Sequence, residues 1–71
     1  MRYVTDVSPA DVGARVVLRH ALPGGGATDV LGELLSWADG VLEVQTRSGP
    51  VRVPEGALLA AKRVPPAPPR R

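Results

Sequence analysis

The 71 residues make one small domain at most, and a chain of this size buries only roughly 60% of its unfolded surface. There is no cysteine, which excludes a disulfide framework and a thiolate metal site. No apolar run approaches the roughly 18 residues that span a bilayer, and the N-terminus has no apolar signal segment. We therefore expect a cytoplasmic protein without membrane contact.

The charge is unevenly distributed along the chain. Nine basic and seven acidic residues give a net charge of +2. From Met1 to Ala61, five arginines stand against seven acidic residues, a balance of −2, and the last ten residues add four basic side chains: Lys62, Arg63, Arg70 and Arg71. A nucleic-acid-binding domain normally carries its basic excess on the folded surface. The distribution therefore makes nucleic acid an unlikely partner, and binding through the basic tail is the alternative function.

The first half of the chain predicts a turn, a strand and a flexible loop. Pro9, Asp11 and Gly13 are turn-forming residues. Residues 15–22 then predict a strand with Val16 and Leu18 on one face. Residues 23–28 predict a loop, because the three glycines are not followed by the Gly-Lys-Ser/Thr and helix start of a nucleotide site.

Residues 28–38 and 41–47 predict a hairpin around Asp39-Gly40, a pair that suits the positive φ values of a type I′ turn. The second strand alternates cleanly, so one of its faces is expected to be buried. The first strand does not, because apolar residues occupy both parities: Val30 and Leu34 on one, Leu31, Leu35 and Trp37 on the other. Either both faces are partly buried or a bulge shifts the register, and Gly32 is the expected pivot.

The remaining elements complete an all-β fold. Residues 47–50 predict a second tight turn, residues 51–53 a short strand, and residues 54–57 a single 3₁₀ turn. Residues 58–64 suit helix or strand by propensity, and a strand is favoured because it would pair an edge left open. The prediction is a small SH3-like barrel of five short antiparallel strands with a 3₁₀ turn before the last strand. Residues 1–64 form the barrel, with its defining patterns in 11–64, and residues 65–71 form a Pro/Arg-rich tail or linker.

Few residues are able to carry out catalysis. His20 is the only histidine, and one imidazole does not make a metal site without other converging ligands. No serine or threonine has a visible base, and the carboxylates are scattered. We predict no catalytic, cofactor-binding or metal-binding residues, no cofactor and no small-molecule ligand, and a surface or strand-end position for His20.

The candidate contacts with a protein partner are the single tryptophan, an outward-pointing arginine and the glycine loop. They are Trp37, Arg52, Gly24, Gly25 and Gly26. Loops held by a scaffold often carry function, and tryptophan is enriched in interfaces. Packing at one end of the barrel is nevertheless favoured over partner contact for Trp37. Aromatic residues make up only 3% of the chain, too few for a polyproline groove or for stacking of single-stranded nucleic acid.

The tail contains a proline motif. Pro65, Pro68 and Arg70 have the spacing of a polyproline ligand for SH3 domains. Proline-rich segments also make semi-rigid spacers. A spacer is the favoured interpretation, because nothing else in the sequence indicates a proline-recognition system.

Residues 11–68 resemble the N-terminal SH3-like domain of a group of actinobacterial acetyltransferases of the GNAT family. The resemblance is carried by TDVLGELLSW with the following Asp-Gly, by VRVP, by AAKRVPP, and by the Ala, Val, Arg and Pro bias. In that family a proline-rich connector leads to a catalytic domain that transfers an acetyl group from acetyl-CoA to an amine. The resemblance therefore implies an accessory module whose partner is another protein or an attached catalytic domain.

The catalytic part of the GNAT family has no counterpart in these residues. Its CoA-binding pattern, Arg/Gln-x-x-Gly-x-Gly/Ala, is absent, and 71 residues leave no room for the roughly 150 of a GNAT domain. No CoA-binding or catalytic residue is carried over. We expect either a free-standing relative of the module or the N-terminal piece of a longer product, and no enzyme unless a GNAT domain follows Arg71.

Overall fold

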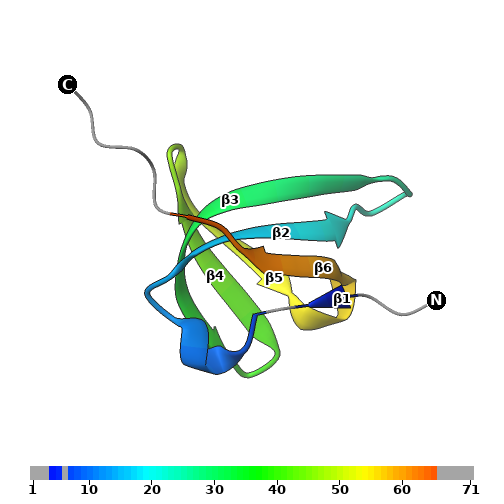
Figure 1. The fold of residues 1–71 in the computed structure, drawn as a ribbon. Coiled ribbons are helices and arrows are strands. Elements are labelled where there is room, and N and C mark those ends of the chain that lie inside the picture. The colour runs from blue at the N-terminus through cyan, green and yellow to red at the C-terminus, as the bar shows by residue number, and fades with distance from the viewer. Residues whose placement is uncertain (1–3, 6, 66–71) are drawn as a thin grey trace.

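The structure is a computed structural model, and it describes residues 4–5 and 7–65. Six strands in this range form one sheet in the order β1-β6-β2-β3-β4-β5. The strands are β1 (Val4–Thr5), β2 (Arg15–Ala21), β3 (Ala27–Ala38), β4 (Val41–Thr46), β5 (Gly49–Pro54) and β6 (Leu58–Arg63). Two 3₁₀ turns, η1 (Pro9–Asp11) and η2 (Glu55–Ala57), lie between strands. The sheet curls so that β4 and β5 lie below β2 and β3 in Figure 1.

The predicted all-β fold is confirmed. Strands β2 to β6 pair antiparallel with one another, and η2 precedes the last strand. The predicted turn over residues 47–50 is too long, because Thr46 already pairs with Gly49 and the turn consists of residues 47–48. Strand β1, which pairs parallel with β6, was not predicted, since two residues carry no detectable alternation.

The first turn of the described chain is held by side-chain caps. The Ser8 hydroxyl accepts the Ala10 N–H at 3.2 Å, and the Asp11 carboxylate accepts the Ser8 N–H at 2.9 Å. These bonds form a capping box around η1. Gly13 follows at φ +99° and donates its N–H to the Leu34 carbonyl at 2.8 Å, which fastens the turn to β3.

Strand β3 changes partner near its middle. Its first half pairs with β2 as far as Glu33, and its second half pairs with β4 from Glu33 onward. A Cβ atom on Gly32 would overlap the Gln45 carbonyl, so only glycine allows the two strands to approach this closely. Gly32 is thus the site of close approach where β3 bends, but the bulge lies at Leu35, between Leu34 and Ser36.

The bulge at Leu35 explains the irregular pattern of β3. Before it, Val30 and Leu34 are buried, while Leu31 is 45% exposed. Leu35, the extra residue, is 38% exposed; after it the parity reverses, so Trp37 packs against the core. Of the two expected alternatives, the register shift is the correct one.

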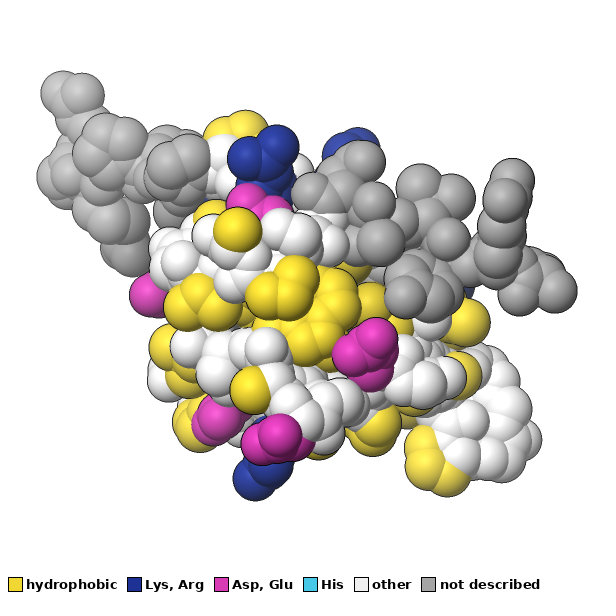
Figure 2. Space-filling model, turned by 90° about the horizontal axis from the view of Figure 1, so that it is seen from below, with side chains coloured by type: hydrophobic (Ala, Val, Ile, Leu, Met, Phe, Trp, Pro, Cys, Tyr) yellow, Lys and Arg dark blue, Asp and Glu magenta, His cyan; other side chains and the backbone are white. Residues whose placement is uncertain are grey.

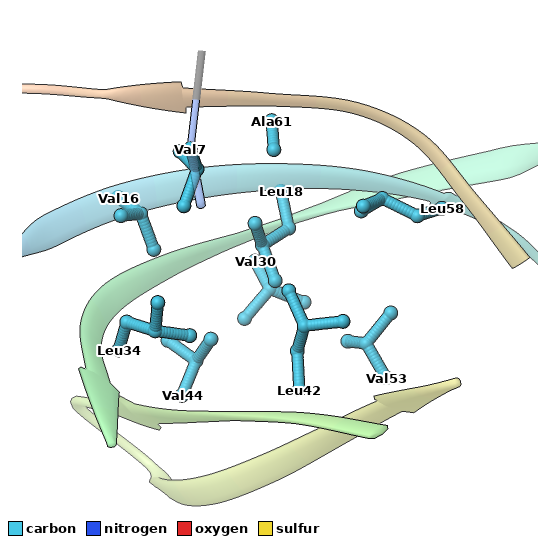
Figure 3. Close-up of a cluster of buried hydrophobic side chains, with 10 residues drawn as sticks. All are labelled: Val7, Val16, Leu18, Val30, Leu34, Leu42, Val44, Val53, Leu58 and Ala61. Atoms are coloured by element: carbon cyan, nitrogen blue, oxygen red, sulfur yellow. The ribbon is translucent and has the colours of Figure 1, made fainter. Parts of the chain in front are cut away.

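A second bulge shapes the end of β6. The register between β2 and β6 shifts at Arg19 and His20, which leaves Leu59 as the extra residue. Leu58 and Ala61 are consequently both buried although they are three residues apart. With eight other residues they form one hydrophobic core between the two layers of the curled sheet (Figure 3). The core members are Val7, Val16, Leu18, Val30, Leu34, Leu42, Val44, Val53, Leu58 and Ala61.

Candidate partner-contact surface

Trp37 lies at one end of the sheet, directly before the turn between β3 and β4. Its ring is partly buried against the core. The indole Nε1–H donates to the Glu55 carboxylate at 3.0 Å, which connects β3 to η2 across 18 residues of sequence. Trp37 therefore both covers the core and fixes the position of η2.

A shallow pocket of about 500 Å³ is lined in part by Gly56 and Ala57 of η2. Its lining is mostly apolar, and the residues come from the end of β2, the loop after it, and the region of η2. They are His20, Ala21, Leu22, Pro23, Pro54, Gly56 and Ala57. Leu22 is 40% exposed, so an apolar side chain of a partner has a surface to pack against.

Turn η2 joins the pocket to Trp37. Glu55 is bonded to the indole, and the next two residues, Gly56 and Ala57, line the pocket. We call the pocket residues together with Glu55 and Trp37 the η2 surface. Among the described residues that line its pocket, His20 is the only ionisable one, and its Nδ1 lies 3.3 Å from the Ala21 carbonyl oxygen. His20 sits at the end of β2, in agreement with the strand-end position expected for it.

The glycine loop lies beside the η2 surface. Gly24, Gly25 and Gly26 all have positive φ values. The loop is closed by the Leu22 N–H, which donates to the Gly26 carbonyl at 3.0 Å, and by the Gly25 N–H, which donates to the Leu22 carbonyl at 3.1 Å. The glycines themselves do not line the pocket, but the loop that they allow positions Leu22 and Pro23 there.

The structure places the other predicted contact residues elsewhere. Arg52 is exposed on β5, opposite Glu43 of β4. Lys62 and Arg63 belong to β6, and Arg63 Nη1 lies 3.7 Å from Asp11 Oδ1. Arg70 and Arg71, together with Pro68, lie outside the described residues. The predicted residues are thus distributed over several surfaces, and only Trp37 and the glycine loop adjoin η2.

Sequence reasoning missed most of the η2 surface. Nothing in the sequence marks three of its members as candidate contacts: Leu22, Pro54 and Ala57. Single apolar residues in loops and at strand ends are common. Only the return of η2 to the end of β2 brings them together. No sequence signal short of the full topology would have found this pocket.

A second groove of about 430 Å³ has a different character. It lies where β3 passes from β2 to β4, and it is lined by Arg15, Leu31, Gly32, Gln45, Thr46, Arg47 and Ser48. Arg15 also donates through Nη1 to the Pro65 carbonyl at 3.0 Å, so the last described residue is held beside this groove. Glu33 stands opposite Arg15 in the β2–β3 ladder.

The face with η1 and the turn between β3 and β4 presents a hydrophobic centre with acidic side chains around it (Figure 2). The segments at this end contribute Asp11 of η1, Asp39 of the turn and Glu55 of η2. Among the described residues, no three metal-ligating side chains lie together. No helix in the described part of the chain is long and apolar enough to cross a membrane.

These features define the class of protein as a small, strongly bent β-domain. A family model described as the Rv0428c N-terminal Sm-like domain matches residues 10–62. Because this range contains 53 of the 71 residues, the chain belongs to that family. The match names a small β-domain and carries no link to acetyltransferases. No curated protein and no solved structure shows significant similarity to the chain.

Proposed function

We propose that the chain is a non-catalytic accessory module that docks on another protein through its η2 surface. The observation that carries the proposal is the mostly apolar pocket of about 500 Å³ that Gly56 and Ala57 of η2 help to line, next in sequence to Glu55, which accepts the Trp37 indole N–H. Partly exposed apolar side chains around a pocket are a feature of protein interfaces.

The acidic residues at this end add a criterion for the partner. Asp39 follows Trp37 by two residues in the sequence. Glu55 accepts the hydrogen bond of the Trp37 indole. A complementary segment would place an apolar side chain in the pocket and basic groups beside these carboxylates, since charge complementarity speeds association and favours one orientation.

The resemblance to the N-terminal domains of GNAT-family acetyltransferases supports a more specific proposal. The partner would be an acetyltransferase catalytic domain, supplied either by a separate protein or by further sequence joined through the proline-rich segment. The module would then contribute docking or stability, and the catalytic domain would supply the CoA site and the chemistry.

Site-specific photo-cross-linking tests the surface and the partner together. A photoreactive benzoylphenylalanine replaces Leu22 in the pocket in one variant and Leu31 in the second groove in a matched control. These leucines are similarly exposed, at 40% and 45%. Irradiation in source cells should link the Leu22 variant to a protein with an acetyltransferase domain and leave the Leu31 variant unlinked.

Two results would contradict the proposal. A partner captured equally from both positions would show that the η2 surface is not selective. A partner captured only from Leu31 would move the contact to the second groove. A selective product at Leu22 without an acetyltransferase domain would keep the docking surface and remove the GNAT assignment.

The second groove supports one alternative function, which is binding of nucleic acid through its phosphate groups. Arg15 and Arg47 supply positive charge, and Gln45, Thr46 and Ser48 supply hydrogen-bonding groups in the same groove. Binding of a fluorescent oligonucleotide should weaken as salt rises if phosphates are contacted. An Arg47→Gln variant should reduce both the affinity and the salt dependence, whereas an Arg52→Gln control should not. Absence of binding by the wild-type protein at low salt removes this alternative.

A further inference from the structure

Strand β5 ends the sheet on one side, and its sequence bears on whether another strand can join it. In the described chain β5 pairs with β4 and with no other strand. Two of its six residues are prolines, Pro50 and Pro54. Proline has no backbone N–H, so in sheets it occupies positions whose nitrogen faces away from the neighbouring strand.

The register shows which backbone groups of β5 face outward. Pro50, Arg52 and Pro54 share one parity and stand opposite Gln45, Glu43 and Val41 of β4. The two prolines cannot donate to β4, so this parity points its backbone groups to the free edge, and Val51 and Val53 point theirs to β4. All three outward residues are exposed.

We infer that Pro50 and Pro54 keep the β5 edge from pairing with a second copy of this chain. Of three outward positions only Arg52 retains an N–H donor, so an added strand would leave most of its carbonyl groups without partners. In a two-fold β5–β5 pair centred on residue 52, the two arginine side chains would also meet with like charge. The inference is independent of the partner proposed for the η2 surface.

Amide hydrogen exchange in the unmodified protein tests the orientation directly. The Val51 and Val53 N–H groups should exchange slowly, because they bond to β4, and the Arg52 N–H should exchange at least tenfold faster. Equal protection of all three amides would overturn the assignment of the outward edge. This measurement requires no variant and so does not depend on the folding of one.

Replacing Pro50 and Pro54 restores the two missing backbone N–H donors and tests whether their absence prevents self-association. Sedimentation should show the wild-type protein and a Pro23→Thr control as monomers, and P50T/P54T as a dimer whose self-association is tighter by roughly ten- to a hundredfold. Circular dichroism establishes that each variant is folded. A folded P50T/P54T that stays monomeric would refute the inference, and so would a wild-type dimer in which pairing protects the Arg52 N–H.

Discussion

The two halves of β3 differ in which alternate residues face the core, although they form one continuous strand. In the half before Gly32, alternation works as the sequence suggests, with Val30 buried and Leu31 exposed. In the half after it, the bulge at Leu35 places Trp37 on the core side although it shares the parity of Leu31. One extra residue therefore decides which apolar side chains form the core and which remain at the surface.

The pairing partners differ in the same way. The first half pairs with β2 and the second with β4, and the crossing depends on the absence of a side chain at Gly32. The alternation of apolar and polar residues therefore predicts which side chains are buried only within a stretch of constant register and constant pairing partner. Substitutions at the crossing, at the two leucines beside the bulge, at the indole contact and on the outer face should therefore differ in their effect on stability.

The largest effect is expected at the crossing. Gly32→Ala should lower the free energy of unfolding by about 3 kcal/mol or more, because the new Cβ meets the Gln45 carbonyl. Gly56→Ala is the matched control, since nothing lies within 4 Å of a Cβ there. Urea denaturation followed by circular dichroism measures both. A tolerated Gly32→Ala would mean that β3 and β4 do not approach as closely as described.

The next effect separates two adjacent leucines. Leu34→Ala removes a fully buried side chain and should cost about 3 kcal/mol in the free energy of unfolding. Leu35→Ala removes a side chain that the bulge leaves 38% exposed, and it should cost under about 1 kcal/mol. Equal losses in chemical denaturation would contradict the burial of Leu34 and the exposure of Leu35.

A smaller effect is expected at the indole. Trp37→Phe keeps an aromatic ring but removes the N–H that donates to Glu55, and it should cost about 1 kcal/mol in the free energy of unfolding. Glu55→Gln retains an oxygen acceptor and should change the stability less. Circular dichroism is the readout, because Trp37 is the only tryptophan and its loss removes the fluorescence signal. A larger loss for Glu55→Gln than for Trp37→Phe would contradict the contact.

The smallest effect concerns the outer face of the first half. Arg19 and Asp29 form an ion pair at 3.1 Å, and both side chains are more than half exposed. Asp29→Asn should lower the free energy of unfolding by less than about 0.5 kcal/mol. High salt should abolish even this difference, because it screens exposed charges. A salt-independent loss of several times that size would show a role beyond the ion pair.

Much of the fold follows from local patterns. Strands β2 and β4, the Asp39-Gly40 turn and η2 lie within one or two residues of the prediction, because alternation, positive-φ residues and proline leave local signals. Strand β6 was predicted as closely, but from the need to pair an open sheet edge and not from a local pattern. The contact surface was harder to predict. Trp37 and the glycine loop were predicted as contact residues, but the pocket depends on the return of η2 to the end of β2, which joins residues more than thirty positions apart in sequence.

The sequence by itself determined the all-β class, the position of most turns and the basic excess at the C-terminal end, since each depends on residue type and short-range order. It also determined that two positions of β5, which are prolines, have no backbone N–H to donate. Only the tertiary structure decided the bulges at Leu35 and Leu59, the pairing of β1 with β6, and the η2 surface. These features arise where distant strands meet, and there the packing of the core overrides the local alternation of the chain.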